Sequence, residues 1–354
     1  MQRTFSSKLI SAVLASVMQG NVKMSGGASA TGRKSIKWMV AALCALPLHV
    51  GAQPFPTQNV RIVVPYAPGG GIDSMARVLA ERLQQKWGKP VIVENKPGAS
   101  TIIGTVTVTK AQPDGHTLLL TSEATVTSNP FLFDKLPYDS IRDLVPISEL
   151  VSLPQMVVAN PSVPASSLKE LVALAQAKPD LLSYASYGSG SLPHLLFEGI
   201  NVRSGVTMRQ IPYKGIAPAV TAVLGGEVQL TLAGVPAAEG HLRAGKLKAL
   251  AIARRERLPA MPQVPTLSES GFGDIDPHES WFGLFVTGGT PPQIVQKIAR
   301  DVAAVAEDPT FIERYVTSRG FDPVFSKPES FAEFIQADRS RKEKLIRLTG
   351  AKAE

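Results

Sequence analysis

Residues 60–84, VRIVVPYAPGGGIDSMARVLAERLQ, combine an apolar run rich in β-branched residues, a glycine turn and an amphipathic helical pattern. The apolar run predicts a buried strand over residues 60–66, and the spacing of the later apolar residues predicts a helix over residues 72–87. The turn between them spans Pro65 to Asp73. Such a junction presents unpaired backbone N–H groups and the positive end of a helix dipole at one point, which favours anion binding.

The same device occurs twice more along the chain. Residues 181–200, LLSYASYGSGSLPHLLFEGI, have their turn at Gly188–Ser191, and residues 207–226, TMRQIPYKGIAPAVTAVLGG, have theirs at Tyr213–Gly215. None of the three turns carries a dinucleotide fingerprint with its acidic ribose partner or a phosphate-binding Gly-Lys-Ser/Thr loop. Three such junctions predict a cleft that holds a small anion rather than a nucleotide.

The remaining chain alternates strand and helix patterns from residue 59 onward, which predicts an α/β fold with mainly parallel sheets flanked by helices. At 354 residues it can form two domains of ordinary size. A strand over Gln155–Ala159 lies between Pro154 and Pro161 and marks the start of a new region. We therefore predict a discontinuous first lobe, residues 53–154 plus 278–354, and a second lobe of residues 155–277.

The net charge of +8 does not indicate a nucleic-acid partner, because it is concentrated in a leader. The first 52 residues hold six basic residues and no acidic one, and removing these six from the 37 basic residues leaves 31 against 29 acidic residues. A basic segment, the apolar stretch over residues 38–48 and small residues at 50–52 predict an export signal over residues 1–52, cleaved after Ala52. The only cysteine, Cys44, lies in this leader, so the mature chain lacks thiols and suits the bacterial periplasm.

Enzyme chemistry has weak support in the sequence. Ser189 and Ser191 lie near His194, but no Gly-x-Ser-x-Gly elbow surrounds either serine. His194 is expected either to cap its helix or to contact a ligand, and the other four histidines are expected in turns or on the surface. No two histidines lie within five residues of each other, so neither a metal site nor a cofactor is predicted.

With these residues in hand, the chain resembles the Bug family of extracytoplasmic solute receptors, related to the citrate-binding TctC group of tripartite tricarboxylate transporters. The resemblance runs from Pro54 to about Thr349. It is carried by ordered stretches such as residues 56–83, 91–100 (VIVENKPGAS), 110–119 (KAQPDGHTLL), 184–198 and 211–228. It implies a type II periplasmic-binding-protein fold, in which two lobes close over a small carboxylated ligand held in the interlobe cleft.

The resemblance also implies which residues contact the ligand. Family members commonly hold the carboxylate through backbone amides, hydroxyl groups and water rather than through an arginine. Carried over by motif, the predicted ligand-binding residues are Tyr66, Ala67, Gly69, Gly70, Gly71 and Asp73 in the first lobe, with Ser186, Gly188, Ser189, Gly190, Ser191, His194, Tyr213, Lys214 and Gly215 in the second.

Two departures from the family pattern concern the ligand. Residues 100–104, Ser-Thr-Ile-Ile-Gly, replace a stretch that usually has a further glycine and a polar residue. If this loop lines the cleft, it favours a ligand with a hydrophobic portion. Gln229 stands where the family tends to have aspartate, which would remove one negative charge available to a ligand amine.

The function implied is a non-enzymatic, monomeric binding protein that delivers a small carboxylate to membrane subunits of a transporter. An alternative is a sensor component that presents the same ligand to a signalling protein, and a secreted serine hydrolase is the remaining alternative. Transport and signalling both use the outer surface of the lobes, so the residues leave that choice open.

Overall fold

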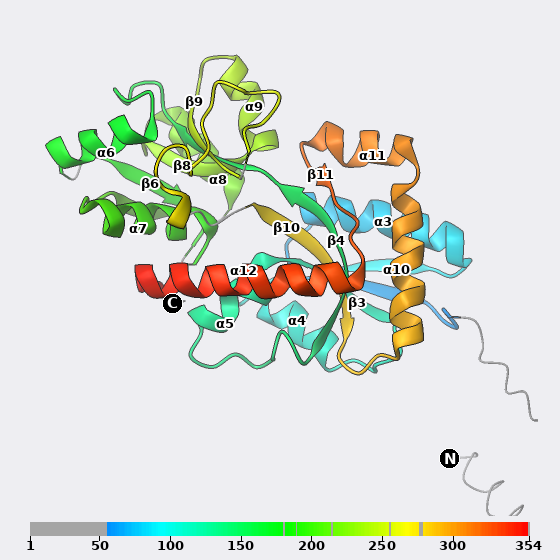
Figure 1. Cartoon of the computed structure of the whole chain (residues 1–354). Helices are drawn as coiled ribbons and strands as arrows, with labels where there is room; N and C mark the ends of the chain where they lie inside the picture. Colours follow the sequence, from blue (N-terminus) through cyan, green and yellow to red (C-terminus); the bar gives the residue numbers. More distant parts are fainter. Residues whose placement is uncertain are drawn as a thin grey trace, which may run out of the picture. The chain divides into compact units, whose positions relative to one another are not determined.

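The computed structural model describes residues 55–179, 181–188, 190–213, 215–254, 256–275 and 279–352 (Figure 1). The predicted leader over residues 1–52, together with the candidate site residues Ser189 and Lys214, lies outside the described residues.

The first sheet has six strands in the order β11-β4-β10-β3-β1-β2. β1 pairs in parallel with β2 and β3, whereas β10 is antiparallel to both β3 and β4, and β11 is antiparallel to β4. The strands are β1 (Val60–Val64), β2 (Val91–Asn95), β3 (Thr117–Ser122), β4 (Leu144–Leu153), β10 (Ser280–Thr287) and β11 (Asp322–Pro323).

The second sheet has five strands in the order β7-β6-β8-β5-β9. β6 pairs in parallel with β7 and β8, and β5 is antiparallel to β8 and β9. The strands are β5 (Gln155–Ala159), β6 (Ser183–Ser186), β7 (Arg209–Pro212), β8 (Leu230–Gly234) and β9 (Lys248–Ala253). The chain thus enters this sheet directly from β4, through Pro154, and returns from β9 to β10 in the first sheet.

The prediction of an α/β fold with helix-flanked sheets is confirmed, but the expectation of mainly parallel pairing needs correction. Both sheets are mixed. The reason lies in the two chain crossings: β4 and β10 run antiparallel to their neighbours in the first sheet, and β5 does so in the second. Parallel pairing is confined to the strands joined by helical crossovers, as those connections require.

Helices cover both faces of each sheet. On the first sheet, residues of α3 and α10 share one core cluster with β1 and β10, while residues of α12 pack with Val63 and Trp281 on the opposite face. The helices are α3 (Gly71–Trp87), α4 (Ile102–Thr109), η1 (Ala124–Ser128), α5 (Asn129–Leu132), α6 (Leu168–Ala177), α7 (Leu192–Ser204), α8 (Ile216–Gly225), α9 (Val235–Arg243), η2 (Gly273–Ile275), α10 (Pro292–Ala306), α11 (Pro309–Tyr315), η3 (Thr317–Arg319) and α12 (Pro328–Thr349).

The long helix α12 takes part in the cores of both sheets. Phe331 and Ile335 in its first half pack with Trp281 of the first sheet, whereas Leu345 and Ile346 in its second half pack in the core of the second sheet. Figure 1 shows α12, in red, running past α5 and α7. The two sheets are therefore linked by this helix as well as by the two chain crossings.

The local helix signals are confirmed where they depend on neighbouring residues. The spacing of Ser167 and Glu170 is typical of a helix start, and the Ser167 side chain accepts a hydrogen bond from Glu170 N at the start of α6. The Glu170 carboxylate in turn accepts one from Ser166 N, at 2.7 Å. His116 lies in the turn before β3, as expected, but it is buried there: its ring lies 4.9 Å from that of Phe55 at a tilt of 52°, and its Nε2 accepts a hydrogen bond from Thr57 N.

We expect Gly104→Ala to destabilise the protein by about 1–3 kcal/mol, the usual cost of overpacking a core. A Cβ atom at Gly104 in α4 would lie 2.8 Å from Lys96 O and 2.9 Å from Pro65 Cα, and neither backbone atom can move aside alone. The measurement is the free energy of unfolding in urea. The matched control is Gly240→Ala in α9, where nothing lies within 4 Å and the gain in helix propensity should stabilise by about 0.5–1 kcal/mol.

Candidate ligand-binding site

The first predicted loop is held in shape by the Asp73 carboxylate at the start of α3. Asp73 is only 3% exposed. Its Oδ2 accepts hydrogen bonds from Gly69 N at 2.9 Å and from Arg77 Nε at 3.0 Å, and its Oδ1 accepts one from Asn95 Nδ2 at 2.9 Å. Asn95 also donates to Tyr66 O. Asp73 therefore fixes the turn from inside, which leaves the backbone N–H groups of the turn to other partners.

These contacts also set the ionisation of Asp73. Burial alone would raise the pKa of the carboxyl group, but the hydrogen bonds from Arg77, Gly69 and Asn95 outweigh it and hold the pKa below 3.8. Asp73 is thus a permanent anion at neutral pH whose charge is already matched. Ala67, Gly69, Gly70 and Gly71, in contrast, are exposed.

Tyr66 connects this loop to the end of the adjacent strand β3. Its hydroxyl group lies 2.7 Å from Ser122 Oγ. Burial raises the pKa of Tyr66 to about 12, with the neighbouring Glu123 carboxylate contributing. The phenol is therefore a neutral hydroxyl at physiological pH, able to donate one hydrogen bond and accept others.

Glu123 lies where the first two predicted loops meet. It follows β3 directly. Burial raises the pKa of Tyr66 after β1 and of Tyr187 after β6, and the nearby charge of Glu123 contributes to both shifts. Its Oε2 accepts hydrogen bonds from Ser280 Oγ at 2.8 Å and from Trp281 N at 3.3 Å. Burial raises the pKa of Glu123, opposed by the ammonium group of Lys342 on α12.

The second predicted loop is closed by its own hydrogen bonds. Ser191 Oγ donates to Gly188 O at 2.7 Å, and His194 Nδ1 accepts from Gly190 N at 2.8 Å. The buried Ser186 Oγ accepts from Gln210 Nε2 at 2.7 Å. Ser191 and His194 therefore maintain the turn and are not paired as a nucleophile and base, so the capping alternative for His194 agrees with the structure.

Gly190 packs this second loop against α5, the short helix that follows β3 and η1 in the chain. Its φ is +75°, a left-handed conformation, and a Cβ atom placed there would meet the Leu132 side chain of α5 at less than van der Waals distance. Leu132 itself packs in the core of the second sheet. Gly190 was predicted only as a ligand contact. It also packs the loop before α7 against α5.

The third predicted loop adjoins the second. Tyr213 N donates to Ser186 O at 2.8 Å, because β7 runs parallel beside β6. The Tyr213 ring is half-buried against the core cluster that includes Ala185, and desolvation with a nearby Glu227 raises its pKa. Gly215, with a φ of +141°, directly precedes α8.

The structure thus brings the predicted loops after β1, β6 and β7 into one region. It adds residues that the sequence analysis missed, namely Ser122, Glu123 and Leu132. Their signal was present in part: Ser122 and Glu123 end a buried strand parallel to β1, so they lie at the same sheet edge as Tyr66. Leu132 gave no such signal, since its role depends on a contact 58 positions along the chain.

The divergent loop before α4 has an unusual backbone. Ala99, Ser100 and Thr101 all have positive φ, at 45°, 49° and 77°. Asn129 Nδ2 supports this conformation by donating to Ser100 O at 2.8 Å, and Thr125 Oγ1 donates to Thr101 Oγ1 at 2.8 Å. Since Thr121 and Thr125 are also close to the Tyr66 hydroxyl, this loop adjoins the first predicted loop through a chain of hydroxyl groups.

The interpretation of Gln229 is wrong. Gln229 Oε1 accepts hydrogen bonds from Ser183 N and Oγ, both at 2.9 Å. Ser183 begins β6, whereas the predicted ligand loops follow the ends of β6 and β7. The residue at position 229 therefore lies at the opposite end of the sheet and joins two strands.

The family of the chain follows from its similarity to known proteins. Residues 75–351 match the model of the tripartite tricarboxylate transporter family receptor. The chain belongs to this family. It is similar to the protein BugT of Bordetella pertussis, with 36% identity over 312 residues, which covers 88% of this chain and 95% of BugT. The family consists of solute receptors. This confirms the prediction that the chain is a binding protein and not an enzyme.

Solved structures of family receptors have the same fold. The periplasmic binding protein BugD is 32% identical with a TM-score of 0.72, and it is matched over 85% of this chain and all of its own. An R. palustris protein with adipate is 29% identical with a TM-score of 0.75, over 85% of this chain and all of its own. MatC from Rhodopseudomonas palustris, with bound malate, is 32% identical with a TM-score of 0.72, over 82% of this chain and all of its own. The receptor chain therefore has the periplasmic-binding-protein fold.

The described part of the receptor was compared with the requirements for a membrane-spanning helix and for a metal site. No helix there is both long and apolar enough to cross a membrane. No group of three His, Cys, Asp or Glu side chains there is placed to hold a metal ion.

We expect Asp73→Asn to lower the free energy of unfolding by about 1–3 kcal/mol at pH 7, because the N–H groups of Gly69, Arg77 and Asn95 lose a charged acceptor inside the receptor. The folded-state pKa is depressed, so this stabilisation is present above the unfolded value of about 3.9 and is lost as the pH falls through the folded value. Urea unfolding at pH 7 and at pH 3 measures it. A difference between the two proteins that stayed constant over this range would contradict the role of the charge.

Proposed function

We propose that this chain is a periplasmic receptor that binds a small carboxylate between the loops after β1, β6 and β7. The observation that carries the proposal is the meeting of loops from the two sheets: Tyr66 after β1 and Tyr187 after β6 both lie near Glu123, Gly190 packs against Leu132 of α5, and the loop after β7 is joined to that after β6 by the hydrogen bond from Tyr213 N to Ser186 O. Relatives of the same fold with adipate and with malate support the ligand class. The proposed lobes are residues 53–154 plus 278–354 and residues 155–277, joined at the two chain crossings.

The ligand charge is proposed to be met by neutral donors. Of the predicted contact residues only Lys214 is cationic and only Asp73 is anionic. Asp73 is already saturated by Gly69, Arg77 and Asn95, so it offers no partner to a ligand amine. Backbone N–H groups at the helix starts and the neutral Tyr66 hydroxyl remain, and a carboxylate accepting several such bonds needs no counter-ion. A carboxylate without an amino group fits this arrangement.

The proposed location is the periplasm, reached through the export signal before Ala52, and the proposed partners are the membrane subunits of a tripartite carrier. The receptor is proposed to act as a monomer. Presentation of the ligand to a sensor protein is the alternative, and co-purification with membrane subunits after mild cross-linking distinguishes the two.

The first test replaces Gly70, where a Cβ atom meets nothing within 4 Å and φ is not positive. Gly70→Val should fold normally and weaken adipate or malate binding at least tenfold, because the side chain would occupy the space next to the turn. Isothermal titration measures affinity, and thermal unfolding checks the fold. Gly190→Val is the contrasting variant: it should also lower the melting temperature, since it collides with Leu132. Unchanged affinity in a folded Gly70→Val protein would refute the site.

The second test addresses the neutral donors. Lys214→Met should weaken carboxylate binding by only about 1–2 kcal/mol, the scale of one charged hydrogen bond. Removing the Ser189 and Ser191 hydroxyls together should cost as much or more. Loss of all binding in Lys214→Met, with normal binding in the double serine variant, would mean that a salt bridge holds the ligand.

A further inference from the structure

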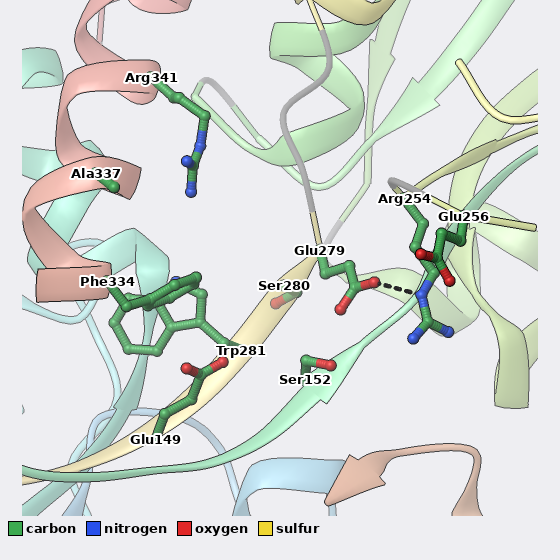
Figure 2. A pocket seen from close by; sticks show the side chains of 10 residues that line it. All are labelled: Glu149, Ser152, Arg254, Glu256, Glu279, Ser280, Trp281, Phe334, Ala337 and Arg341. Atoms are coloured by element: carbon green, nitrogen blue, oxygen red, sulfur yellow. Dashed lines mark ion pairs between the residues drawn. The ribbon is translucent and has the colours of Figure 1, made fainter. Parts of the chain in front are cut away.

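A cavity of about 440 Å³ lies where the two chain crossings pass beside α12 (Figure 2). Its size is within the usual range for small-molecule sites. None of the predicted carboxylate-binding residues that the structure describes lines it. The described lining residues come from β4, β10, α12 and the segment after β9; they are Glu149, Ser152, Arg254, Glu256, Glu279, Ser280, Trp281, Phe334, Ala337 and Arg341.

The Glu149 carboxyl group is the unexplained feature of this cavity. Glu149 lies in the middle of β4 and is only 6% exposed. Its backbone N–H donates to Ser326 Oγ, but no described residue donates a hydrogen bond to its carboxyl group. Burial, together with the like charges of Glu279 and Asp338, raises its pKa to about 8. A buried acid without a partner is costly, and such groups usually have a functional explanation.

The cations around the cavity are engaged elsewhere. Arg254 lies 2.9 Å from Glu279 Oε1 and 3.0 Å from Asp322 Oδ2, so two carboxylates match its single charge. Arg341 Nη2 lies 3.7 Å from Asp338 Oδ1. Once these pairs are formed, Glu149 has no cation among the described residues, and the rim adds the exposed Glu256. Among the described residues, the cavity therefore offers no free cation to an ionised Glu149.

Two further features of the cavity indicate what kind of compound could occupy it. Arg341 Nε is buried and has no hydrogen-bond acceptor among the described residues, so an acceptor is missing as well. The rings of Trp281 and Phe334 line the wall beside Glu149, with centroids 6.0 Å apart (Figure 2). Trp281 is fully buried and meets Phe334 edge-on, so the half-buried Phe334 ring is the aromatic surface open to an occupant. An aromatic ring beside a carboxylate favours an organic ammonium group. A metal ion fits less well, because no suitable group of three ligands occurs among the described residues.

We propose that this cavity binds a small organic ammonium compound, with its cation at Glu149 and a hydroxyl or similar acceptor at Arg341 Nε. The site is separate from the proposed carboxylate site and does not depend on it. Residues of both sheets line the cavity. Glu149 lies in β4 of the first sheet, and Arg254 directly follows β9 of the second sheet. An occupant that contacts both would couple its binding to any motion about the crossings.

The test is titration of the purified protein with ethanolamine, followed by calorimetry and by the fluorescence of Trp281. Glu149→Gln should weaken binding at least tenfold. The matched control, Glu256→Gln, makes the same chemical change on the exposed rim and should alter affinity less than threefold. Arg341→Met should remove the preference of the wild type for ethanolamine over ethylamine, which lacks the hydroxyl acceptor.

The proton balance provides an independent readout. A bound ammonium favours ionised Glu149, so binding at pH 7 should release a proton in the wild type and none in Glu149→Gln, as measured in buffers of different ionisation enthalpy. The affinity of the wild type should rise between pH 6 and pH 8. Of the other groups facing Glu149, Arg254 and Glu279 are ion-paired with each other, Arg341 lies beside Asp338, and Asp338 on α12 is hydrogen-bonded to Trp281 Nε1.

Two results would overturn the proposal. One is the absence of binding at 10 mM ethanolamine and ethylamine, which would mean that water alone fills the cavity. The other is equal affinity in the wild type and Glu149→Gln. Glu149→Gln should keep its melting temperature, because it replaces a buried acid by a neutral group of the same shape, so a loss of binding is not a loss of fold.

Discussion

The buried carboxylate of Asp338 on α12 is the constraint on which the arrangement of the two sheets depends. Its Oδ2 accepts hydrogen bonds from Thr127 Oγ1 at 2.7 Å and from Trp281 Nε1 at 3.2 Å, and Lys342 Nζ lies 3.9 Å from its Oδ1. A charge with 1% exposure is tolerated only when all of these partners are in place. The network therefore fixes the position of α12 against β10 and against the segment that follows β3. The same helix contributes Leu345 and Ile346 to the core of the second sheet. The position of α12 therefore also determines where these two side chains pack.

The network also reaches the proposed binding region. Lys342 is fully buried and acts on two acids, Asp338 on its own helix and Glu123 after β3. Burial raises the pKa of Glu123, whereas the ammonium group of Lys342 and the hydrogen bonds from Ser280 and Trp281 lower it, so its ionisation depends on this balance. The electrostatic potential at the meeting point of the loops is thus determined by a helix that contributes none of the predicted contact residues.

What the sequence could predict follows the range of the interactions. The strand and helix in residues 60–87 were recognisable because their signals are periodic and their turn, with Asp73 at the third helical position, is held by contacts within a few residues. Glu123 and Leu132 were missed because their roles depend on residues far along the chain. Strand β4 gave no clear pattern, since Pro146 and Glu149 interrupt it. A buried acid in a central strand contradicts local preferences, and such conflicts are expected at functional sites.

The distribution of arginines suggests a physical reason why the proposed cleft would use neutral donors. Arg254 is committed to ion pairs beside the chain crossings, and Arg77 to Asp73, so neither is available to the ligand. A receptor must release its ligand to a partner, and most differences in affinity between related complexes lie in the rate of dissociation. Burying an arginine–carboxylate pair makes its separation costly, because each charge would be left uncompensated. Several hydrogen bonds from backbone groups can instead be exchanged for water one at a time. Binding through helix starts therefore allows the affinity for a charged solute to be combined with its release.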